Sequence, residues 1–217
     1  GVWKQVEEAG AASTALLPVT QAATLQAGRR ALNSGPWVSI FDYITDATTR
    51  ADILAFTQTA DVSAYVQAAC DAADDIGAAI YFPPGRYPIL STITTEGVSF
   101  LGDQFVEDLY PYGSKGTVFV FTSTTNTPFK LGESVLFQGI VFYWPNQIES
   151  AATWVANTNA PIAYPPLIEN ASTTTSLTGF AFFDNVVLNA YDFIDVGGNT
   201  AFDKGGRWNF SGNRICA

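Results

Sequence analysis

After Gly77 the chain is a series of short apolar runs, most of which end in Gly, Pro, Asn or Asp. Runs rich in Val, Ile, Phe and Thr between such turn residues predict β-strands. No second helical pattern of comparable quality interrupts them, so the sequence predicts a mainly β fold. The expected strands cover residues 37–44, 78–82, 86–90, 91–95, 98–101, 117–121, 134–142, 180–188, 191–196 and 207–210.

Several of these runs share one shape, in which apolar residues precede a polar residue, Gly or Asn, and further apolar residues follow. Residues 136–142, 183–188 and 208–213 show it most clearly. A loose repeat with loops of unequal length is typical of a solenoid, here a parallel β-helix. An antiparallel sandwich is the alternative, although the Asn-Gly and Asp-Gly pairs of tight hairpins are absent from the sequence.

One segment ahead of the strands has helical periodicity. Residues 61–76 place apolar side chains at 62, 65, 66, 69, 70, 73 and 76, the stripe of an amphipathic helix. Asp61 is a suitable N-cap, and Gly77 is a suitable stop at the other end. Three acids lie off the stripe, where we expect them to face solvent: Asp71, Asp74 and Asp75.

The first 35 residues differ from the rest because they are rich in Ala, Thr and Gln, and a turn signal of sequence Asn-Ser-Gly-Pro ends them. We predict two parts: residues 1–35 form an arm for attachment or oligomerisation, and residues 36–217 form the β domain. A poorly ordered terminus is the alternative for residues 1–35. The chain contains no Met, even at position 1, so we expect a processed product or a piece of a longer protein.

Charge and composition exclude several classes of function. The 217 residues include 20 acids and 10 bases, a net charge of −10, which argues against nucleic acid and anionic membranes as partners. No stretch of 18 apolar residues occurs, so we expect no membrane insertion. The absence of His removes His-based triads and His–metal sites. We expect no metal and no cofactor.

Five segments resemble, in the same order, the opening of right-handed β-helices of the pectate-lyase superfamily, and they look most like those of bacteriophage tailspikes. The resemblance is good over residues 38–147 and looser over 177–217. This order of segments is specific for the fold but not for an activity, because the superfamily contains lyases, hydrolases and non-enzymatic receptor binders. The matching segments are an entry strand (38–44), a capping helix (61–73), a strand, Pro-Gly turn and strand (78–89), a second rung (97–104) and a rung that ends in an aromatic-Pro-Asn-Gln loop (136–147).

The resemblance implies a mainly β chain that forms a right-handed single-stranded parallel β-helix with an N-terminal capping α-helix. A helix over the first coil would cover strand edges that otherwise invite pairing with other chains. No capping element follows residues 207–210. Because solenoids need a cap at each end, we expect residues 36–217 to be the N-terminal part of a domain truncated at its C-terminus.

By the same resemblance, the expected function is that of a phage tailspike, which recognises bacterial surface polysaccharide and, in enzymatic members, depolymerises it. The resemblance also implies a homotrimer in the virion tail, joined to other virion tail proteins through the N-terminal arm. Two alternatives remain open: a free-standing, secreted polysaccharide lyase or glycoside hydrolase, and a non-enzymatic structural spike or adaptor of the tail. Catalytic residues, if there are any, are expected outside this chain.

Aromatic residues after the 134–142 strand are the candidates for sugar binding. Aromatic rings stack on the apolar C–H faces of sugars, and long loops on a rigid scaffold commonly carry binding sites. The alternative is that Tyr143 and Trp144 pack the base of the loop or a subunit interface. The candidate carbohydrate-binding residues are Tyr143, Trp144, Asn146, Gln147 and Trp154.

Paired carboxylates are what glycan hydrolysis would require. Most acids near the expected strands are interpreted as turn residues, and Asp192 and Asp195 are expected on opposite faces of a strand. A lyase base could come from Lys204, Arg207 or Arg214, although a solvated turn is the simpler interpretation. Cys70 and Cys216 are expected to be free thiols. The acids considered are Asp103, Glu133, Asp184, Asp192, Asp195 and Asp203.

Overall fold

The computed structural model describes residues 37–103, 116–147, 162–171, 179–195 and 208–216. The chain divides into two units between Gly35 and Pro36, and all of the described residues belong to the second unit. The expected role of residues 1–35 as an arm lies outside the described residues and stays a prediction.

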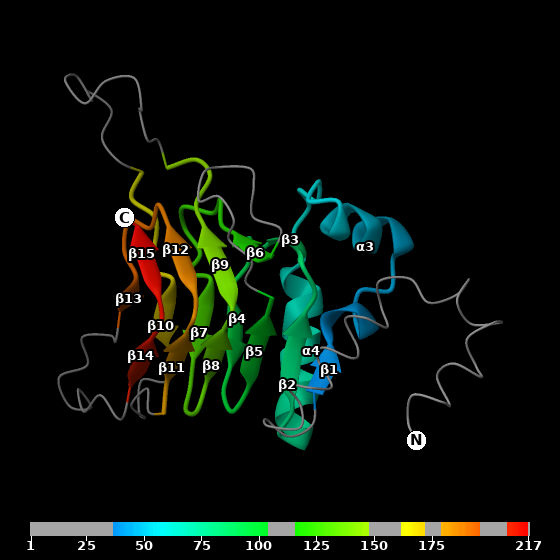
Figure 1. Ribbon diagram of the computed structural model, residues 1–217, viewed down its shortest axis with the longest axis horizontal. Helices are drawn as coiled ribbons and strands as arrows, with labels where there is room; N and C mark the ends of the chain where they lie inside the picture. The colour runs from blue at the N-terminus through cyan, green and yellow to red at the C-terminus, as the bar shows by residue number, and fades with distance from the viewer. Residues whose placement is uncertain (1–36, 104–115, 148–161, 172–178, 196–207, 217) are drawn as a thin grey trace. The chain divides into compact units, whose positions relative to one another are not determined.

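Fifteen described strands form three sheets in which every pair of neighbours is parallel (Figure 1). Successive strands rotate among the sheets, which makes the domain a parallel β-helix and confirms the predicted fold class. Sheet A contains β1 (Trp37–Ser39), β2 (Ala79–Phe82), β5 (Ser99–Gly102), β8 (Leu136–Gln138), β11 (Ala181–Phe183) and β14 (Asn209–Ser211). Sheet B contains β3 (Gly85–Pro88), β6 (Thr117–Val120), β9 (Ile140–Tyr143), β12 (Val186–Leu188) and β15 (Arg214–Cys216). Sheet C contains β4 (Ile93–Thr95), β7 (Phe129–Leu131), β10 (Ile168–Asn170) and β13 (Ile194–Asp195).

Aromatic side chains fill the interior in columns set by the strand register. In sheet A, Phe100 pairs with Phe137 and Phe137 with Phe182, and all three are fully buried. The rings of Phe100 and Phe137 stack with centroids 4.6 Å apart. In sheet B, Phe119 pairs with Phe142 on the facing wall. Each coil therefore presents bulky apolar side chains to the next, and this burial is the main source of stability.

The corner that leads into sheet A uses a left-handed residue in four coils, where it follows α4 in the first coil and sheet C in the other three. Gly77, Gly97, Ser134 and Gly179 occupy equivalent positions and have φ between 58° and 70°. Three of the four are Gly, which adopts this conformation without strain. The residue that follows is buried in every coil, so the reversal directs one apolar side chain into the core: Ala78, Val98, Val135 or Phe180.

Two helices lie at the N-terminal end of the coils: α3 (Ala47–Leu54) and α4 (Ser63–Ile76). The buried face of α4 joins the main core, as the stripe predicts, although Ile76 is exposed. The Gln67 side chain accepts from the Thr94 N–H at 2.9 Å and donates to the Thr94 carbonyl at 2.8 Å. Because β4 is the edge of sheet C, this amide occupies hydrogen bonds that a further strand would use.

Sheet B is closed at the same end by α3. A Cβ atom on Gly85 of the edge strand β3 would lie 2.6 Å from Ile53 Cγ2 and 2.7 Å from the Ile53 carbonyl oxygen, so the helix packs directly on the glycine backbone. This helix was not among the elements expected from the sequence, in which residues 45–60 are polar and irregular. Its signal is Asp46, whose carboxylate accepts from the Thr49 N–H and caps the helix.

Asp61 ties the start of α4 to the first coil. The helix begins at Ser63, one residue later than an N-cap at Asp61 would place it. The Asp61 carboxylate accepts from the Ser63 N–H and hydroxyl, and also from the Leu90 N–H at 3.1 Å and the Ser91 hydroxyl at 2.9 Å. Burial alone raises the pKa of this carboxyl, but these hydrogen bonds outweigh it and hold the pKa below its usual value.

The lowered pKa of Asp61 predicts acid sensitivity of the helix attachment. A carboxylate with a depressed folded-state pKa stabilises the fold above its unfolded pKa of about 3.9, and this contribution is lost as the pH falls through the folded value. We expect Asp61→Asn to lower the free energy of unfolding by about 1–2 kcal/mol at pH 7. Urea unfolding at pH 7 and pH 3 should show this difference shrinking in acid. The control is Asp75→Asn on the exposed side of α4, and an equal deficit at both pH values would contradict the assignment.

In the last described coil, side chains in the interior columns are partly exposed to solvent. Phe210 follows Phe182 in the sheet A column and Ile215 follows Val187 in sheet B, yet their side chains are 42% and 51% exposed. Within the described part of the chain, no helix covers this end. The two ends of the coil stack therefore differ in how their edges are covered.

Several sequence-based bounds change in the structure. The expected strand 134–142 is two strands that meet at Gly139, and 180–188 is two strands that meet at Asp184 and Asn185. The expected strand 37–44 ends at Ser39 and continues as a 3-10 helix. Three described strands, each three residues long, lie outside the expected ranges: β7, β10 and β15.

Candidate carbohydrate-binding surface

A row of polar side chains runs along the outer face of sheet C. The register pairs Thr94 with Lys130, Lys130 with Glu169, and Glu169 with Asp195. Their neighbours in the strands, such as Ile93 and Phe129, point into the core, so alternation along each strand turns this row outward. Adjacent parallel strands lie about 4.8 Å apart, which spaces the row at intervals close to the size of a sugar ring.

Glu169 is the best-connected member of the row. Its carboxylate lies 3.5 Å from Lys130 Nζ and accepts from the Thr127 hydroxyl at 2.5 Å. The Glu169 side chain is 31% exposed and the Lys130 side chain 46%, so both remain accessible from solvent. These contacts hold Glu169 in one orientation beside Asp195 and produce two carboxylates on neighbouring coils.

The corner between sheets B and C borders this row. Gln147 donates to the Ile162 carbonyl at 3.2 Å and accepts from the Ile162 N–H at 2.8 Å, which joins the two ends of the excursion between β9 and β10. Asn146 is exposed and hydrogen bonds to Tyr164. Burial raises the pKa of the Tyr164 phenol, and the hydrogen bond to Asn146 reduces that effect. Gln147 therefore shapes the corner, and Asn146 presents a polar group on it.

The aromatic candidates are separated by the structure. Trp144 is 1% exposed and packs on Phe121 with ring centroids 4.7 Å apart, so its indole fills the interior. Tyr143 is half-buried against an apolar cluster on the outer face of sheet B that includes Val120 and Val141. In these positions both side chains pack against the protein, which was the alternative left open for them from the sequence. Trp154 lies outside the described residues.

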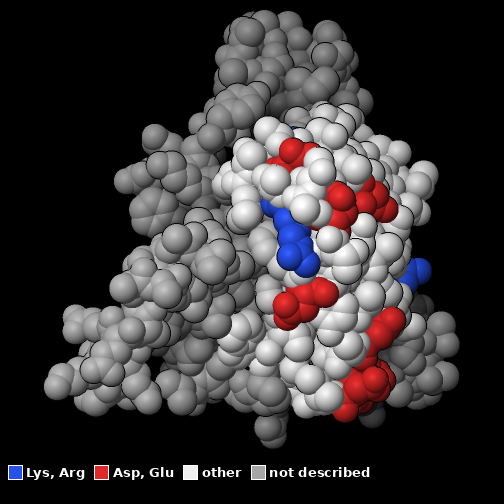
Figure 2. Space-filling model, turned by 90° about the vertical axis from the view of Figure 1, so that its right-hand side faces the viewer, with Lys and Arg blue, Asp and Glu red and all other residues white. Residues whose placement is uncertain are grey.

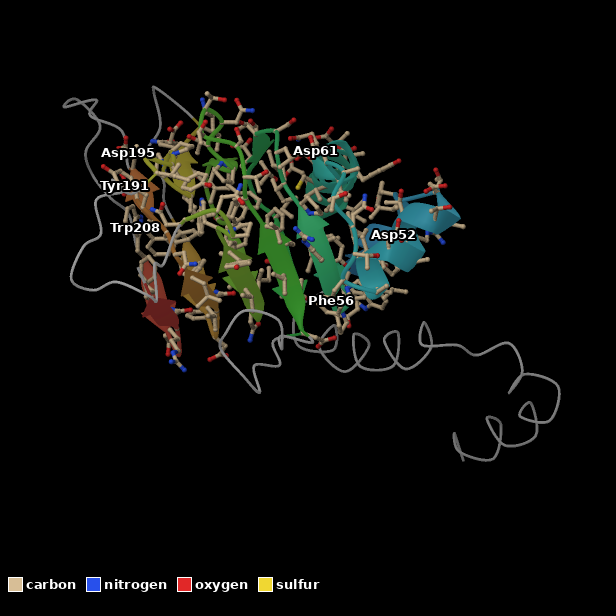
Figure 3. The ribbon with its side chains drawn as sticks, turned by 90° about the horizontal axis from the view of Figure 1, so that it is seen from above. Asp52, Phe56, Asp61, Tyr191, Asp195 and Trp208 are labelled. Carbon is tan, nitrogen blue, oxygen red and sulfur yellow. The ribbon has the colours of Figure 1, made fainter. Side chains whose placement is uncertain are left out.

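One exposed aromatic side chain lies in the sheet B to sheet C corner and was not among the candidates. Tyr191 is 53% exposed and precedes Asp192 and the strand that carries Asp195. Figure 3 shows Tyr191 and Asp195 at the same end of the molecule, opposite the end that carries Asp52. Residues 191–196 were expected to form one strand, but β13 begins only at Ile194, so Tyr191 lies in the corner before it.

A groove of about 390 Å³ lies beside the N-terminal end of sheet C. The helix α4 contributes Asp71 and Asp74, and the strand β4 and the corner after it contribute Thr94 and Glu96. Cys70 lines the groove from the core side, and burial raises the pKa of its thiol to about 12. Cys70 is free, as expected, and remains a protonated, unreactive thiol at neutral pH.

The acids considered from the sequence do not form a common site. Asp103 accepts from the Tyr81 hydroxyl near the sheet A to sheet B corner, and Asp184 occupies the same type of corner two coils later with φ of 51°. Asp192 accepts from the Phe193 N–H and lies in a turn before β13. Glu133 is exposed in a corner, and Asp203, Lys204 and Arg207 lie outside the described residues.

Glu169 was not among the candidates, because it lies in a long Ser-, Thr-, Ala- and Asn-rich stretch, residues 148–176, that contains none of the expected strands. The available signal was Leu167-Ile168 ahead of Glu169, two apolar residues that resemble the start of the other short strands. Only the parallel register places Glu169 beside Asp195, since 26 positions separate them in the sequence.

Comparison with known proteins adds no family to this picture. No protein-family model matches the chain, and no curated protein matches it. Among the described residues, no helix has the length and apolar character needed to span a membrane. Within the same residues, no three His, Cys, Asp or Glu side chains are grouped as metal ligands would be.

Proposed function

We propose that this chain binds a bacterial surface polysaccharide through the outer face of sheet C and the adjoining sheet B to sheet C corner. The observation that carries the proposal is the outward row Thr94, Lys130, Glu169 and Asp195, next to the exposed ring of Tyr191. Hydrogen-bonding side chains at regular spacing, with an aromatic ring at one end, suit a chain of sugar units. A rigid sheet also fixes these groups before binding, which lowers the entropic cost of association.

The resemblance of residues 38–147 to bacteriophage tailspikes supports the same proposal and extends it. On this basis the protein is a homotrimer of the virion tail, and residues 1–35 attach it to other tail proteins. A secreted lyase or hydrolase and a non-enzymatic structural spike are the alternatives. Native mass spectrometry tests the assembly, because a single 23.3 kDa species would contradict the trimer.

The binding experiment uses capsule or lipopolysaccharide polysaccharides from a panel of bacteria, with affinity measured by calorimetry. We expect Tyr191→Ala to weaken binding about tenfold, which corresponds to roughly 1.4 kcal/mol. Leu54→Ala is the matched control, because Leu54 is also exposed but belongs to α3, away from sheet C. Binding that is equally strong in both variants would remove Tyr191 and its corner from the site.

Cleavage of the polysaccharide is a second candidate function, which the position of Glu169 beside Asp195 favours. Retaining glycosidases hold two carboxyl groups about 5–5.5 Å apart, close to the strand spacing of about 4.8 Å. We expect Glu169→Gln to reduce oligosaccharide release at least about 100-fold and to weaken binding far less, because the amide keeps a hydrogen-bonding group in the row. Glu133→Gln is the control, and unchanged release in Glu169→Gln would exclude the pair from catalysis.

A further inference from the structure

The surface that includes the proposed binding face carries charge of almost one sign. It consists of the outer side of α4, sheet C and the described parts of the corners on both sides of sheet C, and we call it the acidic face. Lys130 is the single Lys or Arg within these described segments. The acids on the acidic face are Asp71, Asp74, Asp75, Glu96, Glu133, Glu169, Asp192 and Asp195.

The other described cations lie elsewhere. Arg86 and Arg214 are in β3 and β15 of sheet B, at outward positions that alternate with the buried Tyr87 and with Ile215. Arg50 is in α3, where its side chain donates to the Ile44 carbonyl oxygen. Lys130 itself is paired with Glu169, so it offers little free positive charge to a ligand.

The acidic face runs from α4 onto sheet C, because Gln67 of α4 hydrogen bonds to Thr94 of the edge strand β4. Figure 3 shows Asp61, at the start of α4, and Asp195, at the end of sheet C, on the same long side, with Phe56 on the opposite side. Figure 2 views the end that carries α3 and α4 and shows mainly Asp and Glu among the charged side chains. Glu169 and Asp195 lie on adjacent strands about 4.8 Å apart, and Asp71, Asp74 and Glu96 line one groove. Like charges within the Debye length of about 8–10 Å reinforce one another, so both places favour a negative potential.

We infer that the polysaccharide bound at this face is uncharged or carries amino groups, and that uronic-acid polysaccharides are excluded by charge. The inference rests on the proposed function and names the ligand class of the same site. Each uronate unit would place one negative charge beside the carboxylates of the acidic face. Lys130, the cation of the described part of that face, is already paired with Glu169. Like-charge juxtaposition opposes both the encounter and the complex, whereas an ammonium group meets complementary charge.

The experiment uses purified surface polysaccharides with and without uronic acids, together with carboxyl-reduced forms of the acidic ones. We expect each polysaccharide that binds to be neutral or amine-bearing, and carboxyl reduction to strengthen binding of an acidic one at least about tenfold at low salt. An acidic polysaccharide that binds as tightly as its reduced form would overturn the inference and leave the proposed function intact. Binding of no member of the panel would overturn the proposed function, and the inference with it.

A charge variant separates the acidic face from the net charge of the chain. The double variant Asp192→Asn/Asp195→Asn removes two charges beside Tyr191, and Asp42→Asn/Asp52→Asn removes two from the 3-10 helix and α3. We expect Asp192→Asn/Asp195→Asn to weaken the binding of amine-bearing ligands about threefold at 20 mM salt. At 300 mM salt, where screening is strong, we expect the same variant to have little effect on binding. Equal effects of the two variants at low salt would show that net charge alone sets the preference and would overturn the assignment to this face.

Discussion

Phe137→Ala should lower the free energy of unfolding by about 3–5 kcal/mol, because it empties the centre of the coil stack. Phe137 is fully buried, with the Phe100 ring stacked on it and the Phe182 ring edge-on to it. Its ring also meets Phe129 of sheet C at 5.0 Å and Phe142 of sheet B at 5.6 Å. Truncation therefore removes contacts to all three walls at once. Urea unfolding, followed by far-ultraviolet circular dichroism, measures the loss.

The matched control is Phe210→Ala, which lies in the same column of sheet A at the exposed end. Phe210 is 42% exposed, so the same truncation removes less apolar surface from water and should cost about 1 kcal/mol. A loss as large as that of Phe137→Ala would mean that Phe210 is covered in solution. A small loss for both variants would contradict the packing of the interior column.

The parallel solenoid could be predicted because its signals are local. The turn residues, the short Phe-rich and Val-rich runs and the stripe of residues 61–76 each act within a few positions of the sequence. The corners were harder to predict. Gly139 alone separates β8 from β9, so the sequence pattern suggested one long strand. The helix α3 was missed because its sequence has little amphipathic character and its cap at Asp46 occurs in a polar stretch.

The candidate site was less predictable because it depends on register. Glu169 and Asp195 belong to different coils, and nothing in the spacing of the sequence places them side by side. The aromatic motif around Trp144 was visible, but alternation along β9 and the corner after it determine that the indole points inward. Side-chain direction in a solenoid follows from the exact ends of strands that are only two to four residues long.

Asn185→Ala should destabilise the fold by about 2–4 kcal/mol, because it leaves buried backbone groups without partners. The Asn185 side chain is fully buried at the corner between β11 and β12. Its Nδ2 donates to the Phe137 carbonyl at 2.9 Å, and its Oδ1 accepts from the Ile140 N–H at 2.9 Å. One amide therefore satisfies the backbone groups on both sides of Gly139 in the preceding coil, and the Gly139 N–H itself donates to the Phe183 carbonyl at 3.1 Å. Thermal unfolding and urea unfolding both measure this loss.

Asn213 provides the control, because it repeats the arrangement one coil later. Its Nδ2 donates to the Phe182 carbonyl and its Oδ1 accepts from the Asn185 N–H, but the side chain is only half-buried. Water can replace part of its hydrogen bonding, so Asn213→Ala should cost less than half as much as Asn185→Ala. If the two variants were equally tolerated, backbone pairing alone would hold the corners, and the stacked Asn side chains would only fill space. If Asn185→Ala alone is costly, the interior corner amide, like the aromatic columns, is a contact that fixes one coil on the next.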